Sequence, residues 1–188
     1  DHARVTQEIE RLIASHRAHA EIRGVLVVEF VDRAGSGLGS ELFVGVRQTR
    51  EFGPVIAAGL GGVDTEYLAS KMMPGLAVAK AVATEITAEQ FFDLFKRTAA
   101  YEIVACAVRG HRRLVSDGEL LRCFRAFILL AQRFCVDRGE SGPDVAELEV
   151  NPFAFNKQRL VPLDGRGRLA TATQRPQARP QEAIAHLL

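Results

Sequence analysis

One segment near the C-terminal end constrains the fold most, because apolar side chains alternate there with side chains that carry oxygen atoms. In an extended strand successive side chains point to opposite faces, so Leu148 and Val150 lie on one face. The opposite face carries Glu147, Glu149 and Asn151. A second apolar run, 159–164, follows a turn around Asn156-Lys157. We therefore predict a β-hairpin with one face toward a core.

The outward face of this hairpin is a candidate metal site. With the turn centred on Asn156-Lys157, Asp164 faces Glu149 and lies diagonal to Asn151. Carboxylates that face each other across a ladder repel, and a cation between them removes that repulsion. Carboxylate and amide oxygens suit Mg²⁺. A solvated hairpin face with ordinary surface acids explains the same residues, and the pattern alone leaves both interpretations open.

The rest of the chain predicts an α+β fold, in which an antiparallel sheet is flanked by helices. Valine-rich and alternating runs predict strands at 24–31, 41–47 and 54–58. Thr87 with Gln90, and Ser116 with Glu119, are capping-box pairs that predict the starts of two helices with phenylalanine-rich core faces. Between these helices we expect a strand at 103–108.

Composition limits the function classes. Lysine and arginine number 24 against 23 aspartates and glutamates, so no broad electrostatic field favours nucleic acid or an anionic membrane. No apolar run has the length of a membrane span. The three cysteines, Cys106, Cys123 and Cys135, have no metal-ligand spacing, so we expect reduced structural thiols and a cytoplasmic protein.

Two further motifs are candidate phosphate contacts. Gly59-Leu60-Gly61-Gly62 follows a short apolar strand, where glycines allow a positive φ and a close approach of N–H groups to an anion. The same residues also suit a plain turn, since neither a P-loop nor a complete dinucleotide-binding motif accompanies them. Arg112 and Arg113 could clamp a phosphate as planar forks, or they could be solvated turn residues.

Taken in order, the motifs resemble the ATP-grasp region of NDP-forming acyl-CoA synthetases over about Gly24 to Leu169. The matching segments are 24–31, 41–46, 52–55, 59–62, 147–153 and 163–164. The resemblance implies the C-terminal ATP-grasp subdomain, with ATP or ADP and Mg²⁺ as ligands. The family reaction interconverts an acid, CoA and ATP with acyl-CoA, ADP and phosphate through phosphohistidine.

The resemblance also implies roles for single residues. Glu29, Phe30 and Val31 match the hinge along the adenine, and Glu41 matches an acidic position near the nucleotide. Gly59, Gly61 and Gly62 match the turn beside the phosphate-transfer site. Asn151 and Asp164 match the metal-ligand pair, with Glu149 where relatives often have aspartate. Arg112 matches the arginine of a Gly-aromatic-Arg-Gly turn, although His111 and Arg113 replace its neighbours.

Departures from the family pattern keep alternatives open. Val28 replaces a usual glutamine, and 65–83 lacks the expected charged residues, which favours a non-catalytic regulatory or interaction module as an alternative. Another ATP-grasp ligase is a third interpretation. We expect a leading helix or linker at 1–23, the subdomain at 24–169 and a tail at 170–188. The expected partners are a nucleotide, the first ATP-grasp subdomain and CoA-binding domains or a subunit, with self-association through an exposed apolar face of 24–31.

Overall fold

The computed structural model describes residues 1–32, 39–62, 71–73, 75–105, 112–135 and 144–170. It divides into two compact units, Asp1–Phe30 and Val31–Leu188. The first unit contains helix α1 (His2–His16), which begins where the Asp1 carboxylate accepts a hydrogen bond from the Ala3 N–H. None of the α1 residues is buried. The helix expected in the leading segment is therefore present.

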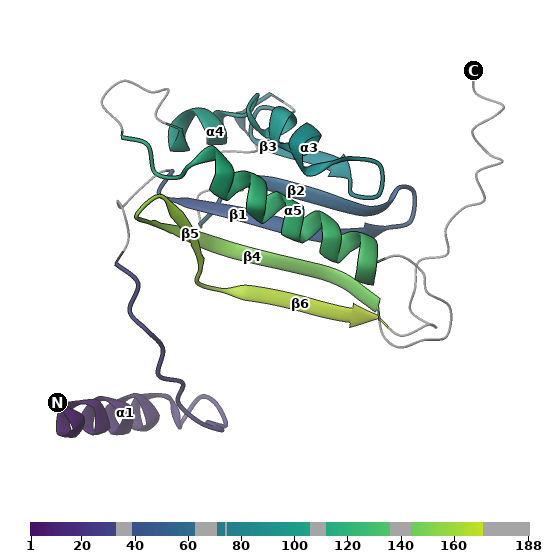
Figure 1. Cartoon of the computed structure of the whole chain (residues 1–188). Helices are drawn as coiled ribbons and strands as arrows, with labels where there is room; N and C mark the ends of the chain where they lie inside the picture. Colours follow the sequence, from purple (N-terminus) through teal and green to yellow (C-terminus); the bar gives the residue numbers. More distant parts are fainter. Residues whose placement is uncertain (33–38, 63–70, 74, 106–111, 136–143, 171–188) are drawn as a thin grey trace, which may run out of the picture. The chain divides into compact units, whose positions relative to one another are not determined.

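The second unit is built on an antiparallel sheet, six-stranded over the described residues (Figure 1). The strand order is β3-β2-β1-β4-β5, and β6 also pairs with β4. The strands are β1 (Glu41–Thr49), β2 (Gly53–Leu60), β3 (Val78–Val82), β4 (Asp144–Asn156), β5 (Arg159–Pro162) and β6 (Gly165–Ala170). The long strand β4 therefore lies between β1 on one side and β5 and β6 on the other.

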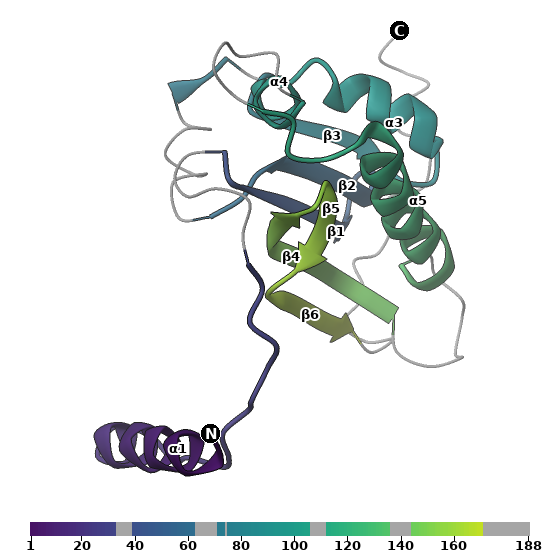
Figure 2. The same ribbon diagram turned by 60° about the vertical axis from the view of Figure 1, so that its left-hand side comes forward.

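Three helices cover one face of this sheet, as Figures 1 and 2 show. They are α3 (Ala88–Phe95), α4 (Ala99–Val104) and α5 (Asp117–Phe134). Leu42, Val44 and Val46 point from β1 into the core beneath them, as period 2 predicts. The Phe124 ring packs edge-on against Phe91 and Phe95, with centroids 5.0 and 5.2 Å apart. The α+β architecture and the aromatic core are thus confirmed.

The helix starts at Thr87 and Ser116 are confirmed, but the two caps differ. Thr87 and Gln90 form the reciprocal capping box. Ser116 accepts a hydrogen bond from the Glu119 N–H, whereas the Glu119 carboxylate accepts one from the Leu160 N–H of β5. The side chain of Glu119 therefore joins α5 to the hairpin, because a strand N–H competes with its own helix terminus for the carboxylate.

The predicted hairpin is confirmed, but its predicted register was wrong. Lys157 and Gln158 form the turn with φ of 47° and 61°, as a two-residue hairpin loop requires, and Asn156 pairs with Arg159. The turn is therefore centred one residue later than expected. Arg166, not Asp164, stands opposite Glu149. A shift of this kind moves the partners by two positions, so each side chain keeps its face of the sheet.

Two predicted strands are not found. Residues 24–31 have no strand assignment, and Leu26 and Phe30 are 85% and 91% exposed. Their side chains suit a sheet, but a strand also needs a hydrogen-bonded neighbour. The expected apolar exposure is present, while self-association stays a prediction. Ile103 and Val104 belong to helix α4, because the Thr98 hydroxyl caps a helical turn by accepting from the Tyr101 N–H.

The remainder of that predicted strand, 106–108, lies outside the described residues. So do residues 171–188, which include most of the expected tail, and residues 65–70 and 74 of the 65–83 segment that departs from the family pattern. Over the part of the chain that the structure describes, no helix combines the length and the apolar character that a bilayer span requires.

Candidate functional site

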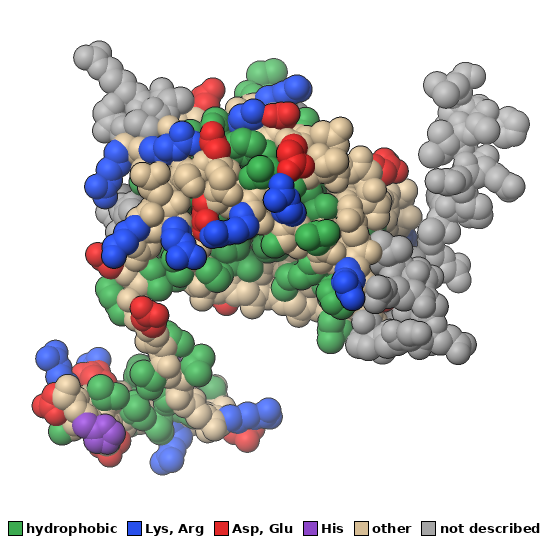
Figure 3. All heavy atoms as spheres, in the orientation of Figure 1, with side chains coloured by type: hydrophobic (Ala, Val, Ile, Leu, Met, Phe, Trp, Pro, Cys, Tyr) green, Lys and Arg blue, Asp and Glu red, His purple; other side chains and the backbone are tan. Residues whose placement is uncertain are grey.

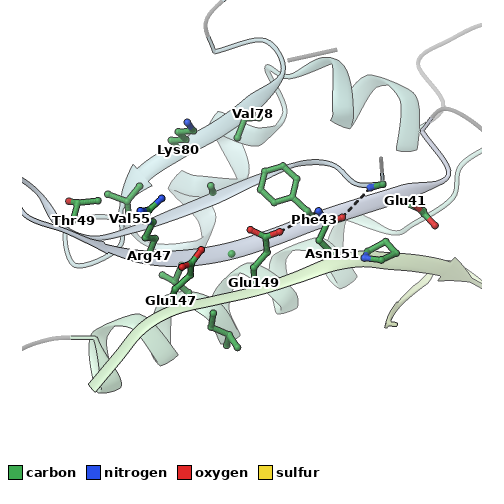
Figure 4. Close-up of a pocket in the computed structure, with 16 residues that line it drawn as sticks. Glu41, Phe43, Arg47, Thr49, Val55, Val78, Lys80, Glu147, Glu149 and Asn151 are labelled. Atoms are coloured by element: carbon green, nitrogen blue, oxygen red, sulfur yellow. Dashed lines mark hydrogen bonds between the residues drawn. The ribbon is translucent and has the colours of Figure 1, made fainter. Parts of the chain in front are cut away.

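An open cleft of about 1040 Å³ lies on the sheet face opposite the helices. Figure 4 shows that β1, β2, β3 and β4 all contribute side chains to it. Its polar residues include Glu41, Arg47, Lys80, Glu147, Glu149 and Asn151. Phe43, Val55, Ala57 and Val78 form its apolar part. A volume of this size is typical of small-ligand sites, which combine apolar surface with a few polar groups.

The glycine segment was expected to be a turn after a strand, but Gly59 and Leu60 are the last residues of β2, paired with β1, and only Gly61 and Gly62 form the turn that follows. A Cβ at Gly61 would lie 2.6 Å from the carbonyl carbon of Leu42, and a Cβ at Gly59 would lie 2.8 Å from the Phe43 ring. Gly62 has φ +88°, and a Cβ there would lie 2.5 Å from a Glu41 carboxylate oxygen. Each of the three glycines therefore permits a contact with β1 that no larger residue could make without displacing it.

Asn151 joins this glycine turn to the acidic strand. Its Oδ1 accepts a hydrogen bond of 3.1 Å from the Gly62 N–H, and its Nδ2 donates one of 3.3 Å to Glu149 Oε1. Gly61 is held as well, since its N–H donates to the Glu41 carbonyl at 2.8 Å. The sequence led us to expect free N–H donors at this turn. In the structure the N–H groups of Gly61 and Gly62 both have protein acceptors, so a ligand that used the Gly62 N–H would displace the Asn151 amide.

The two cleft-facing glutamates of β4 have different surroundings. Glu147 stands opposite Arg47 of β1, and its carboxylate lies 3.6 Å from the Arg168 guanidinium of β6. Glu149 stands opposite Gly45, which has no side chain. A Cβ at Gly45 would lie 3.4 Å from both Cβ and Cγ of Glu149. The Glu149 side chain therefore occupies the space that Gly45 leaves open. Arg166 of β6 stands opposite Glu149 on the other side, but over the described residues Glu147 is the one of the two acids that has an ion pair.

Asp164 lies at the junction of β5 and β6. The Asn151 N–H donates to the Asp164 carbonyl at 3.1 Å, which places Asp164 across from Asn151 and not across from Glu149 as predicted. The Asp164 side chain is exposed and does not line the cleft. The structure thus brings Glu149 and Asn151 together directly, and Asp164 is their neighbour through the backbone.

The donor set of the cleft fits a hard cation. Glu149 supplies carboxylate oxygens, and the neighbouring Asn151 would add its amide oxygen by turning it from the Gly62 N–H toward a shared cation. Mg²⁺ commonly takes one or two carboxylates and completes its shell with water and substrate phosphates. Within the described residues no group of three or more histidine, cysteine, aspartate or glutamate side chains is placed to hold a metal. A cation here would therefore depend on ligand oxygens as well as on protein oxygens.

The other predicted site residues lie elsewhere. Glu29 and Phe30 belong to the first compact unit, and Val31 begins the second. Glu29 is exposed and Val31 is half-buried. Arg112 lines a separate cavity of about 370 Å³, together with Lys157 and Gln158 of the hairpin turn. The structure does not bring Arg112 into the cleft that contains Glu149 and Asn151.

Sequence reasoning did not single out Phe43, Arg47 and Lys80 as site residues, although all three line the cleft. The signal for the first two was available, because alternation along β1 places Phe43 and Arg47 on the face of Glu41. For Lys80 the signal is the alternation Val78, Lys80, Val82. That pattern was missed because β3 is short and lies in the 65–83 segment, which departs from the family pattern.

Comparison with known proteins identifies the fold family. The family model described as the ATP-grasp domain matches residues 2–169. Acetate–CoA ligase (ADP-forming) I of Archaeoglobus fulgidus is 29% identical over 159 residues, which are 85% of this chain and 20% of that protein. The beta subunit of acetate–CoA ligase (ADP-forming) I of Pyrococcus furiosus is 24% identical over 81% of this chain and 56% of the subunit. The chain therefore spans about a fifth and just over half of the lengths of these relatives.

A third relative has solved structures. It is the dinucleotide-forming acetyl-coenzyme A synthetase 1 of Candidatus Korarchaeum cryptofilum. One of its structures, with coenzyme A, acetyl-coenzyme A and a phosphorylated phosphohistidine segment, has a TM-score of 0.68 at 24% identity and covers 90% of this chain and 67% of that one. Another contains coenzyme A and Mg-AMPPCP, with a TM-score of 0.54 at 25% identity, and covers 73% and 55%. With its family model matched over 2–169, this chain belongs to the ATP-grasp domain family.

Proposed function

We propose that this chain is the nucleotide- and magnesium-binding part of an ADP-forming acid–CoA ligase. The observation that carries the proposal is the side chain of Asn151, which hydrogen-bonds both the glycine turn and Glu149. Gly62 and Asn151 are 89 residues apart in the sequence, yet they meet at one end of the cleft. A glycine turn suits a phosphate and oxygen ligands suit a hard cation, so their meeting at one place supports a site for both.

The relatives support the same chemistry. Two are acetate–CoA ligases that form ADP, and a third has been solved with coenzyme A and Mg-AMPPCP. The proposed overall reaction is acid + CoA + ATP giving acyl-CoA + ADP + phosphate, and its reverse. This chain would supply the ATP and ADP end. The first ATP-grasp subdomain and the CoA-binding domains or subunit would supply the remaining groups, so turnover requires them.

Each predicted site residue has a role in this proposal. Glu149 and Asn151, with Asp164 beside them, would hold Mg²⁺, which when bound would supply positive charge to phosphate oxygens. Gly59, Gly61 and Gly62 let the phosphate chain approach the backbone of the turn, next to Glu41. Glu29, Phe30 and Val31 lie along the adenine. Arg112 contacts the transferring group when the neighbouring domains close.

Calorimetric titration of the 188-residue chain with ADP, in Mg²⁺ and in EDTA, tests the proposal. Replacing Glu149 by Gln removes a charged ligand, so ADP binding in Mg²⁺ should weaken by about tenfold, which corresponds to about 1.4 kcal/mol. In EDTA the same variant should bind ADP as well as the parent chain or better, because one negative charge near the phosphates is gone. This opposite response is specific to a metal-mediated contact.

The matched control is Glu85→Gln, which removes an equally negative but exposed side chain outside the cleft. It should leave ADP binding unchanged with and without Mg²⁺. A parent chain that binds ADP equally well in Mg²⁺ and EDTA would contradict the metal assignment. A parent chain that binds no nucleotide would favour the alternative of an interaction module.

A further inference from the structure

The wall of the cleft opposite the acids carries a lysine that the proposed function has not used. Lys80 of β3 pairs with Ala57 of β2, Ala57 pairs with Gly45 of β1, and Gly45 pairs with Glu149 of β4. These residues form one row across the sheet, and all of them except the glycine direct a side chain to the cleft. Lys80 and Glu149 are separated by three strand spacings, about 14 Å between backbones. Figure 4 shows the two residues on opposite walls, with β2 and β1 between them.

The floor between these walls is almost free of side chains. Gly45 has none and Ala57 has a single methyl group, whereas Arg47 and Val55 fill the next row of the same sheet face. A trough therefore runs from Lys80 to Glu149 along the sheet. The Glu149 stem lies over Gly45, and the four-carbon stem of Lys80 reaches from the other side. One ligand lying in the trough could contact both ends.

Lys80 has no ion-pair partner within the described part of the chain, whereas Lys96, Arg125 and Arg168 each have one. Figure 3 shows the helix-covered face, where red and blue side chains lie next to each other. There Lys96 pairs with Asp93 and Arg125 pairs with Glu89. Within the cleft the acid near Arg47 is Glu147, which also contacts Arg168. Lys80 is thus the cation on the cleft wall opposite Glu149, and none of the ion pairs among the described residues compensates its charge.

We propose that Lys80 binds an anionic phosphate oxygen of the ligand directly, from the wall opposite the Glu149–Asn151 metal site. The inference rests on the proposed nucleotide site and adds a second, metal-independent contact to it. An ammonium group acts as a compact point charge with rotatable donors, which suits a phosphate whose oxygens are already partly shared with a cation. The ligand would then bridge a cation-binding wall and a cationic wall.

Lys80 also has a structural explanation that the test must separate. Strand β3 is at the edge of the sheet over the described residues, and exposed lysines on edge strands discourage pairing with other chains. That role predicts a change in self-association and no change in phosphate binding. Direct binding predicts the reverse.

The experiment measures binding of ADP, pyrophosphate and adenosine, each in Mg²⁺, to the parent chain and to Lys80→Gln, Lys80→Arg and Lys96→Gln. Lys96 is the matched control, because it is an exposed lysine at the end of α3 on the opposite face. We expect Lys80→Gln to weaken ADP and pyrophosphate binding by about tenfold, the loss of one charged hydrogen bond, and to leave adenosine binding unchanged. Lys80→Arg should stay within about threefold, because the charge is kept. Lys96→Gln should match the parent chain.

The outcomes separate this inference from the proposed function. If the parent chain binds Mg-ADP and Lys80→Gln binds it equally well, the inference is wrong and the proposed function stands. An equal loss of adenosine and ADP binding would also overturn the inference, because the contact would not be to phosphate. If the parent chain binds pyrophosphate but not ADP, with Lys80 required, the anion contact stands and the nucleotide proposal fails. Failure to bind either probe would overturn both.

Discussion

Gly61 offers a sharp test of how the glycine turn is held. Its N–H donates to the Glu41 carbonyl at 2.8 Å, so the turn is bonded to β1 at this residue. In Gly61→Ala the new methyl group would lie 2.6 Å from the carbonyl carbon of Leu42, 2.7 Å from its oxygen and 3.1 Å from its nitrogen. These are backbone atoms in the interior of the sheet. Neither side can move cheaply, so the turn must withdraw from β1.

The magnitude follows from three contributions. Overpacking costs about 1–3 kcal/mol, and the strained or broken hydrogen bond costs about 1 kcal/mol. Reduced freedom of the unfolded chain returns about 0.4–1 kcal/mol when alanine replaces glycine. The net loss is about 2 kcal/mol, which lowers the melting temperature by about 4–8 °C in a chain of this size. Denaturant titration gives the same free energy independently.

Gly118→Ala is the matched control for this substitution. Gly118 lies in the first turn of α5, and a Cβ there meets nothing within 4 Å. Alanine should therefore stabilise the protein by about 0.5–1 kcal/mol through helix propensity. If Gly61→Ala melts within 1 °C of the parent, on the order of the error of such scans, while Gly118→Ala melts higher, the contact between the glycine turn and β1 described here is wrong.

Two further outcomes follow from the core. Burial raises the pKa of the Cys123 thiol to about 12, and burial also raises the pKa of Cys135 to about 11. In a Cys106→Ser background, iodoacetamide should therefore label both thiols slowly at pH 8 in the folded protein and rapidly in urea, since only the thiolate reacts. The stability linked to these raised pKa values is present below pH 9 and is lost as pH rises above it. Phe124→Ala should cost about 3–5 kcal/mol in denaturant titration, because it empties the centre of the aromatic core, while exposed Leu129→Ala should cost less than about 1 kcal/mol. Fast labelling of the folded protein, or equal costs for the two truncations, would contradict the burial of these side chains.

Helix caps and strand alternation, which depend on residues close together in the sequence, were predicted correctly. The capping residues Thr87 and Ser116 located two helix starts, because a side-chain oxygen three residues before an amide is a contact within one turn. Alternation in β1 and β4 predicted which side chains face the core, including Leu42. Pairing that depends on distant residues was harder. Whether 24–31 finds a sheet neighbour cannot be read from its own side chains.

The sequence predicted the part of the candidate site that lies on one strand and missed the parts that depend on pairing between strands. Alternation placed Glu149 and Asn151 on one face, and the structure has them hydrogen-bonded. The residue opposite Glu149 depends on which two residues form the hairpin turn. Lys157 and Gln158 form it in the left-handed conformation, which asparagine and glycine adopt more often, so the sequence favoured a turn that includes Asn156. Lys80 was not predicted because its position opposite Glu149 follows only from the pairing of four strands.

The hydrogen bonds of Asn151 explain why an amide stands at that position. A carboxamide both donates and accepts, so one side chain of this length can satisfy the Gly62 N–H and the Glu149 carboxylate at once. An aspartate could accept from Gly62, but it would place a second negative charge against Glu149. The amide therefore keeps this end of the cleft in a defined geometry without a cation. The protein can then meet its ligand with the glycine turn and the acid already in position, and the Asn151 amide is the group that has to turn when a ligand or a cation takes over its partners.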